Sequence, residues 1–159
     1  MWLTKKIVIA TDFGEPSHAA ADIGLELAVT FRVPIVLVHA YMVPGMLYRA
    51  LPAAPIIEYA KIYEEAARES LAHEEARLAG KGPEINAVLR SGVAWEQILS
   101  VAQQVDAGLI VVGTHGRRGL PRALMGSVAE KVVRTSPIPV LTVHAHPEAQ
   151  PTVTSPLQR

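Results

Sequence analysis

The sequence predicts an α/β protein whose mostly parallel, five-stranded sheet is flanked by helices. Short apolar, β-branched runs alternate along the chain with longer stretches of helical periodicity. Two of the short runs, 35–38 and 109–112, are apolar without interruption, which is typical of parallel strands buried on both faces. The 159 residues suit a single domain, because about 100–200 residues is the usual domain size.

The first strand is predicted over residues 7–10, and a helix is predicted to follow it. Pro16 and Ser17 indicate the start of the helix, since proline has a suitable fixed φ and serine offers a side-chain oxygen. The spacing i, i+3, i+4, i+7 predicts that this helix buries Ala20, Ile23, Gly24, Leu27, Ala28 and Phe31. Val33 and Pro34 end the helix.

The second strand, 35–38, is followed by a segment that reads as a long loop. This segment, 41–57, contains three prolines and one glycine. Residues 58–79 then predict a second helix, in which Glu64 and Arg68 form a favourable i, i+4 pair. Its apolar stripe is expected to consist of Tyr59, Ile62, Tyr63, Ala66 and Leu71.

The second half of the chain predicts three more strands and two more helices. Apolar and polar residues alternate, though not strictly, over 85–89, and this pattern favours a strand near a sheet edge. A helix is expected from Trp95 onward, and 109–112 reads as a central strand. The last helix is expected over 127–135 and the last strand over 140–143. No internal repeat or second domain is evident.

Composition excludes several classes of protein. The chain has no cysteine, 15 Lys and Arg residues, and 15 Asp and Glu residues, so disulfides and thiolate metal sites are ruled out. Balanced charge argues against nucleic acid as a partner, because no strongly positive field is present to bind phosphates, and we expect none. No apolar run has the roughly 18 residues needed to cross a bilayer, and the N-terminus lacks a signal-peptide core. We expect a cytoplasmic protein with one domain over 1–145 and a disordered tail over 146–159.

A glycine-rich segment follows the fourth predicted strand. Gly113, Gly116 and Gly119 lie within seven residues, and Gly126-Ser127 stands at the start of the last predicted helix. Such glycines let backbone N–H groups turn toward an anion, and a helix N-terminus favours negative charge. The G-x-x-x-x-G-K-[ST] and G-x-G-x-x-G motifs are both absent. Alternatively, the glycines are only turn residues, and Ser127 with Glu130 forms a capping box.

The spacing of these glycines resembles the ATP-binding signature of the universal stress protein family. The resemblance extends over nearly the whole chain, from Thr11-Asp12 after the first strand to the closing segment 137–143. It implies the strand order 3-2-1-4-5 and a Rossmann-like fold of the adenine nucleotide alpha hydrolase type. The strand order would then reverse between the first and fourth strands, beside Asp12 and Gly113.

The same resemblance implies which residues contact ATP, together with Mg²⁺ or Mn²⁺. The floor for adenine and ribose would be Ala10, Thr11 and Asp12, and the edge of adenine would meet backbone groups of Ala40. The ribose and phosphates would meet Gly113, Thr114, His115, Gly116, Arg117, Arg118 and Gly119. The residues closing over the phosphate chain would be Gly126, Ser127, Val128 and Ala129.

Several of these side chains have a plainer alternative role. Asp12 is either a ligand of ribose or of a hydrated metal ion, or a turn residue that caps nearby N–H groups. Arg117 and Arg118 either bind phosphate or are solvated loop charges. His115 fits a polar contact better than acid–base catalysis, since no carboxylate or hydroxyl is placed beside it by the sequence. Among the other histidines, His39 and His144, at strand ends, are expected to be structural, and His18 and His73 are expected to lie on helix surfaces.

The resemblance implies an ATP-binding stress protein that senses or buffers adenine nucleotide, with at most slow hydrolysis. Two alternatives remain: a nucleotide-free dimerisation module of the same fold, and an enzyme that splits ATP between the α and β phosphates. The latter class carries a Ser-Gly-Gly-x-Asp-Ser loop after the first strand, where this chain has Thr-Asp-Phe-Gly-Glu. A homodimer is expected through the edge strand Val140, Leu141, Thr142 and Val143.

Overall fold

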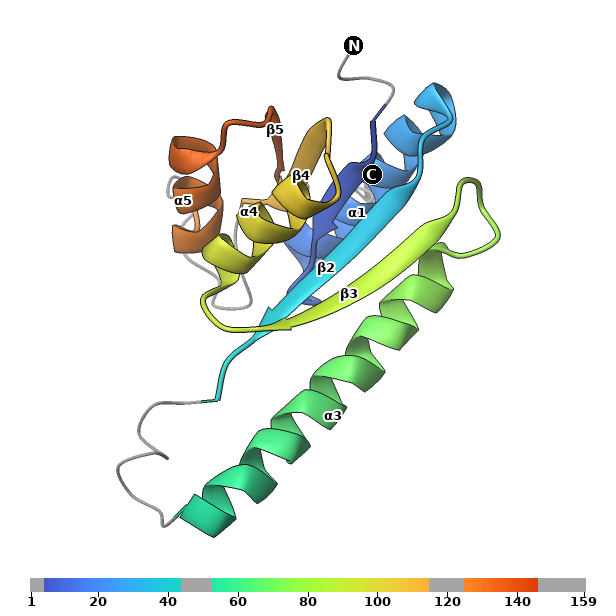
Figure 1. Ribbon diagram of the computed structural model, residues 1–159. Coiled ribbons are helices and arrows are strands. Elements are labelled where there is room, and N and C mark those ends of the chain that lie inside the picture. Colours follow the sequence, from blue (N-terminus) through green and yellow to red (C-terminus); the bar gives the residue numbers. More distant parts are fainter. Residues whose placement is uncertain (1–4, 44–52, 115–124, 146–159) are drawn as a thin grey trace, which may run out of the picture.

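The computed structural model describes residues 5–43, 53–114 and 125–145 of the chain. Its five strands form one parallel sheet in the order β3-β2-β1-β4-β5 (Figure 1). This arrangement confirms the predicted fold class and strand order. The strands are β1 (Ile7–Ala10), β2 (Ile35–Tyr41), β3 (Ile85–Ser91), β4 (Leu109–Gly113) and β5 (Val140–Val143).

Helices cover both faces of the sheet. Figure 1 shows one pair of helices, α1 (Glu15–Phe31) and α3 (Ala53–Leu78), on one face, and a second pair, α4 (Ala94–Gln104) and α5 (Ser127–Thr135), on the other. Alternate strand residues point to opposite faces. The core under α1 and α3 contains Ile7, Ile9, Ile35 and Leu37. The core under α4 and α5 contains Val8, Val36, Val38 and Ile110.

The buried face of α1 differs in part from the prediction. Ile23 and Phe31 are exposed, whereas Ala21 and Leu25 are buried. The helix axis lies very close to the sheet, since a Cβ atom on Gly24 would be 2.5 Å from Ile9 Cδ1. Only small side chains fit such a close approach, so the larger apolar residues lie at the margins of the contact.

The predicted loop over 41–57 is wrong at both ends. Tyr41 belongs to β2, and α3 begins at Ala53. Pro55 therefore lies in the first turn of a helix. Proline is tolerated there, because the first N–H groups of a helix have no intrahelical acceptor.

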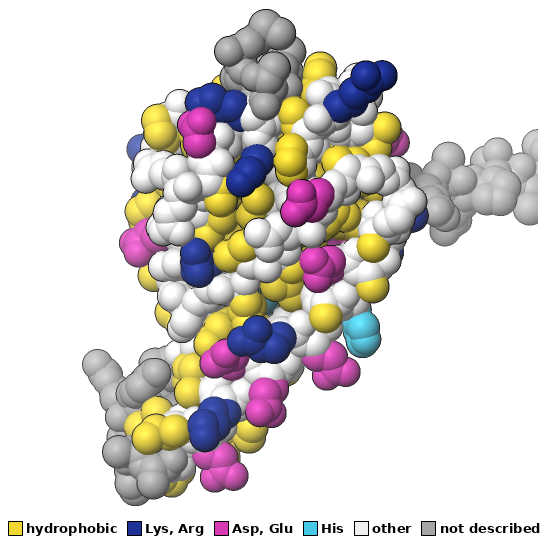
Figure 2. Space-filling model, turned by 45° about the vertical axis from the view of Figure 1, so that its right-hand side comes forward, with side chains coloured by type: hydrophobic (Ala, Val, Ile, Leu, Met, Phe, Trp, Pro, Cys, Tyr) yellow, Lys and Arg dark blue, Asp and Glu magenta, His cyan; other side chains and the backbone are white. Residues whose placement is uncertain are grey.

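The apolar stripe predicted for α3 is also largely wrong. Tyr59, Ile62 and Tyr63 are exposed, and the buried residues over 55–78, where burial is described, are Ala67, Leu71, Glu74 and Leu78. The N-terminal half of α3 extends beyond the end of the sheet, so little of the sheet lies against it (Figures 1 and 2). The predicted pair of Glu64 with Arg68 is confirmed, with an N–O distance of 2.7 Å.

The remaining predicted elements are confirmed to within two residues at each end. β3 and β5 lie at the two edges of the sheet. The edge position of β3 agrees with the alternation of apolar and polar residues in its sequence. No helix in the described part of the chain is long and apolar enough to span a membrane. The tail 146–159 lies outside the described residues.

Candidate functional site

The candidate site lies at the carboxyl ends of β1 and β4. From β1 the chain continues to β2 and β3 on one side, then crosses to β4 and β5 on the other. In an open parallel sheet, this reversal opens a crevice beyond the strand ends, where ligands bind. Thr11-Asp12, directly after β1, and Gly113-Thr114, at the end of β4, are therefore brought to one place, as the resemblance implied.

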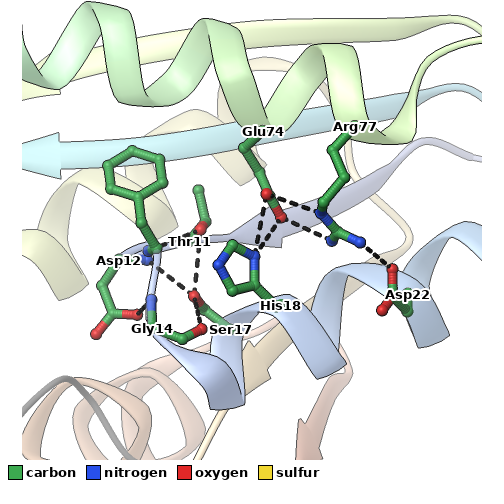
Figure 3. A network of polar contacts seen from close by, with 9 residues as sticks. Thr11, Asp12, Gly14, Ser17, His18, Asp22, Glu74 and Arg77 are labelled. Atoms are coloured by element: carbon green, nitrogen blue, oxygen red, sulfur yellow. Dashed lines mark hydrogen bonds and ion pairs between the residues drawn. The ribbon is translucent and has the colours of Figure 1, made fainter.

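The turn after β1 is held by its own side chains (Figure 3). The Thr11 hydroxyl accepts a hydrogen bond from the Phe13 N–H at 3.0 Å, and Asp12 Oδ1 accepts one from the Gly14 N–H at 3.0 Å. Phe13 has a φ of +64°, a strained value for a residue other than glycine. Thr11 is buried and Asp12 half-buried. Asp12 therefore caps an N–H group of the turn, which is one of its two expected roles. It also lies at the strand end, where a ligand of this type of sheet would bind.

Ser17 supports this turn from the first turns of α1. Its hydroxyl donates to the Gly14 carbonyl at 2.9 Å and lies 3.2 Å from the Thr11 hydroxyl. Ser17 is buried. The sequence indicates Ser17 only as part of a helix start, because the contact with Thr11 depends on how the chain folds back after β1.

β2 extends beyond β1 at this edge. Ala10 is the last residue of β1 in register with β2, opposite Val38, while β2 continues to Tyr41. The β1-facing side of the backbone near Ala40 therefore lies past the end of the neighbouring strand, which suits the adenine-edge role implied for it.

His39 links the ends of β1 and β2. Its Nδ1 donates to the Thr11 carbonyl oxygen at 2.7 Å, and its ring lies 4.3 Å from that of Phe13, centroid to centroid. These contacts support the structural role expected of His39.

The carboxyl end of β2 is also joined to α3. The Tyr41 hydroxyl donates to Glu64 Oε2 at 3.3 Å. Burial raises the pKa of Tyr41, and the nearby charge of Glu64 raises it further. Tyr41 therefore stays a neutral hydrogen-bond donor at this edge of the sheet.

The end of β4 is joined directly to the start of α5. The Gly126 N–H donates to the Thr114 carbonyl, and the Thr114 N–H donates to the Val143 carbonyl at 2.9 Å. The hydroxyl of Thr114, which is fully buried, lies 2.8 Å from His144 Nδ1. These bonds hold the start of α5 beside the end of β4. Five residues expected to contact ribose and phosphates lie outside the described residues: His115, Gly116, Arg117, Arg118 and Gly119.

The first residues of α5 present backbone N–H groups at this edge. Gly126 is the N-cap, without a side-chain cap hydrogen bond, so the alternative of a capping box at Ser127 is wrong. Ser127 is the first helical residue, one position too late to act as the cap. Helix geometry leaves the N–H groups of Ser127, Val128 and Ala129 without intrahelical acceptors. Ser127 and Val128 are exposed, while the Ala129 side chain is buried in the core.

A charged network beside the turn fastens α3 to α1 (Figure 3). Glu74 is buried, and its carboxylate accepts hydrogen bonds from His18 at 3.0 Å and from Arg77 at 2.8 Å. Arg77 also contacts Asp22 at 2.6 Å. His18 lies at the helix surface, as expected, with 40% of its side chain exposed. It also pairs with this buried carboxylate. Sequence reasoning missed Glu74, since its partner His18 is 56 positions away.

This network shifts the pKa of both charged groups on α3. Burial acts to raise the pKa of Glu74, but hydrogen bonds from Arg77 and His18 outweigh burial and lower it. The hydrogen bond to Glu74 raises the pKa of Arg77 against the opposing effect of burial, and Asp22 adds to the rise. Both groups therefore remain charged at neutral pH.

The described residues contain no group of three or more His, Cys, Asp or Glu that could hold a metal ion. Asp12 is the one carboxylate among the described residues to which the resemblance assigns a place at the site.

These features define an open parallel α/β protein with a candidate ligand site at the reversal of its strand order. The chain belongs to the universal stress protein family, whose family model matches residues 4–144.

Relatives and solved structures agree with this assignment. Universal stress protein MJ0531 of Methanocaldococcus jannaschii is 34% identical over 142 residues, covering 89% of this chain and 82% of the relative. The structure of protein MJ0577 superposes with a TM-score of 0.76 at 25% identity, covering 91% of this chain and 99% of that one. The universal stress protein of Archaeoglobus fulgidus in complex with dAMP superposes with a TM-score of 0.60 at 25% identity, covering 90% and 99%.

Proposed function

We propose that this protein binds an adenine nucleotide at the carboxyl ends of β1 and β4, and that ATP is the nucleotide it uses as a cytoplasmic stress-response protein. One observation carries the proposal. The hydrogen bond from Gly126 to Thr114 holds the N-terminus of α5 beside the end of β4, at the strand reversal. The dAMP complex of the Archaeoglobus fulgidus protein supports an adenine nucleotide as the ligand class.

In this proposal the nucleotide lies across the crevice with its base toward β2. Backbone groups of Ala40 meet the adenine edge, and Ala10 and Asp12 support the base and ribose. The phosphates lie between Gly113 and the start of α5, where the N–H groups of Ser127, Val128 and Ala129 face them. Ala129 contributes only its backbone, because its side chain is buried in the core.

The binding energy must be shared among several contacts. A helix N-terminus contributes about 0.3–1 kcal/mol to an anion, and up to about 2 kcal/mol when partly buried. Micromolar affinity requires about 8 kcal/mol. Burial of adenine and the N–H groups of the glycine-rich segment must supply the rest, and Arg117 and Arg118 add charge-assisted contacts to phosphate.

The site favours binding over fast catalysis. Asp12 Oδ1 is already an acceptor for the Gly14 N–H, and the buried Thr11 hydroxyl is engaged by Phe13 and Ser17. A Mg²⁺ or Mn²⁺ ion would arrive with the phosphates and use Asp12 as a ligand directly or through water. We therefore propose a nucleotide sensor or buffer with at most slow ATP hydrolysis.

Isothermal titration of the full chain with ATP and Mg²⁺ tests nucleotide binding, with GTP as the matched control. Saturable binding of ATP in preference to GTP is expected. A chain that binds neither nucleotide but dimerises would be the nucleotide-free module instead. Chromatography of a long incubation separates the enzymatic alternatives, because cleavage between the α and β phosphates yields AMP and pyrophosphate, whereas slow γ-phosphate hydrolysis yields ADP.

We also propose that two copies associate through β5. This strand lies at the sheet edge beside β4 and all four of its residues are only half-buried. An apolar edge strand presents unpaired backbone groups that a second copy can satisfy. Sedimentation analysis at micromolar concentration tests this, and Leu141→Lys should favour the monomer. A monomeric wild type would contradict the proposal.

A further inference from the structure

The long helix α3 presents three different faces around its axis. At about 100° per residue, the buried residues Ala67, Leu71, Glu74 and Leu78 fall within one arc of about 60°. The next arc, about 100° wide, contains four exposed residues that we call the outer stripe: Tyr59, Ile62, Tyr63 and Ala66. Beyond it, an arc of about 40° contains three further exposed residues that we call the acidic edge: Glu58, Glu65 and Glu69.

The outer stripe is apolar without being buried by the described fold. The exposed fractions are 54% for Ile62, 44% for Tyr59 and 40% for Tyr63. The stripe lies on the half of α3 that extends away from the sheet, where Figure 2 shows hydrophobic side chains beside charged ones. Apolar residues at helical spacing on a projecting helix are typical of a surface that another element covers.

The charge beside the stripe indicates what kind of partner fits. Six charged residues lie between positions 58 and 69, and two of them, Glu64 and Arg68, pair with each other at 2.7 Å. Lys61 is then the one basic residue beside the acidic edge. Three carboxylates and one ammonium group leave a net charge of −2 (−3 + 1). None of these four forms an ion pair within the described part of the chain.

We infer that the outer stripe of α3 binds a cationic amphipathic helix of another protein. Its apolar residues would cover Tyr59, Ile62 and Tyr63, and its Lys or Arg residues would pair with the acidic edge. A second copy of this chain fits less well, because an antiparallel pair of α3 helices would bring two acidic edges together. Tyr59 and Tyr63 suit such an interface, because tyrosine is among the residue types that dominate binding energy at interfaces.

The test uses two synthetic peptides of helical spacing that differ only in charge. Both carry Leu at positions i, i+3, i+4 and i+7; one carries Lys elsewhere and the other carries Glu. Fluorescence anisotropy of each labelled peptide is measured against the full-length protein. The Lys peptide should bind at least about tenfold more tightly than the Glu peptide, and added salt should weaken its binding.

Variants locate the binding on α3. Ile62→Gln should weaken binding of the Lys peptide about tenfold, as expected of a central interface residue, and Glu65→Gln with Glu69→Gln should reduce both affinity and salt dependence. Val29→Gln, at an exposed apolar residue of α1 (45% exposed), is the matched control and should leave binding unchanged. Circular dichroism verifies that each variant is folded.

Three outcomes would overturn the inference. Equal affinity for the two peptides would show that charge does not select the partner. Equal effects of Ile62→Gln and Val29→Gln would place the binding elsewhere. Self-association of the wild type that Ile62→Gln abolishes would make a second copy the occupant of the stripe. The nucleotide site takes no part in this test, so failure of one proposal leaves the other standing.

Discussion

Gly113, at the end of β4, lies so close to Pro16 in the first turn of α1 that a Cβ atom on Gly113 would be 2.7 Å from the Pro16 carbonyl carbon. The same Cβ would lie 2.9 Å from the backbone nitrogen of Ser17. The contact is with backbone, which cannot move aside as a flexible side chain can. Glycine is therefore needed at position 113 for packing, in addition to any role beside a nucleotide.

The first prediction concerns this contact. Gly113→Ala should lower the free energy of unfolding by about 1–3 kcal/mol, the range for overpacked sites. Gly24→Ala is the matched control, because the nearest atoms to its new Cβ would belong to side chains, those of Ile9 and Val111, and not to backbone. Alanine also favours a helix by up to about 1 kcal/mol over glycine. Urea unfolding measures both. A smaller loss for Gly113→Ala than for Gly24→Ala would contradict the packing argument.

The second prediction concerns the turn that Ser17 supports. Ser17→Ala removes the hydroxyl that contacts Thr11 and Gly14, so Asp12 loses a fixed position. We expect nucleotide affinity, measured by isothermal titration, to fall about three- to tenfold, in line with about 1 kcal/mol for one hydrogen bond. Ser70→Ala removes a half-buried serine of α3 that bonds to a backbone carbonyl of its own helix and should leave affinity unchanged. Unchanged nucleotide affinity in Ser17→Ala would show that the turn after β1 does not contribute to nucleotide binding.

The third prediction concerns pH and Glu74. Its pKa is lowered from 4.5 in the folded protein, so its ionised form stabilises the fold above that pH, and the contribution is lost as the pH falls through the folded value. Glu74→Gln should lower the free energy of unfolding at pH 7 by about 1.5–3 kcal/mol and flatten its decline in acid. Glu69→Gln, an exposed change on the same helix, is the control. If the free energy of unfolding declined equally with falling pH in wild type and Glu74→Gln, this stabilising role of the Glu74 carboxylate would be excluded.

The fourth prediction concerns the glycine-rich segment. Gly116→Val should abolish ATP binding, because a branched side chain would stand where backbone N–H groups must approach phosphate. Titration calorimetry with ATP and Mg²⁺ measures the effect, and a thermal melt verifies folding. Wild-type affinity in this variant would remove the role proposed for position 116, which lies outside the described residues.

Sequence patterns predicted the strands better than the faces of the helices. Uninterrupted apolar runs such as Ile35–Val38 mark buried parallel strands, because both sides of such a strand must be apolar. Helical spacing failed for Ile23 in α1 and for Tyr59, Ile62 and Tyr63 in α3. Periodicity indicates which residues share a face of a helix, but it does not show how close the helix lies to the sheet or where the sheet ends.

The residues of the candidate site also fall into two groups, those that the sequence places and those that only the structure places. The residues after the strands, Thr11-Asp12 and Gly113-Thr114, can be placed from the sequence because strand ends in a parallel sheet share one edge. The parts that Ser17, His39 and Gly126 play in holding that edge could not. The contact of Ser17 with Thr11 depends on the path of the turn after β1, and His39 and Gly126 bond to residues that are more distant in the sequence, Thr11 and Thr114.

The amino-acid sequence by itself determined the alternation of strands and helices and the positions of the glycines, because these depend on local periodicity and composition. The spacing of those glycines also carries the resemblance to the family that the family model matches. Tertiary structure alone decided that α1 approaches the sheet through its small residues, that Glu74 is buried against His18, and that half of α3 lies beyond the sheet. The physical reason is that burial depends on what surrounds a residue in space, and those neighbours come from distant parts of the chain.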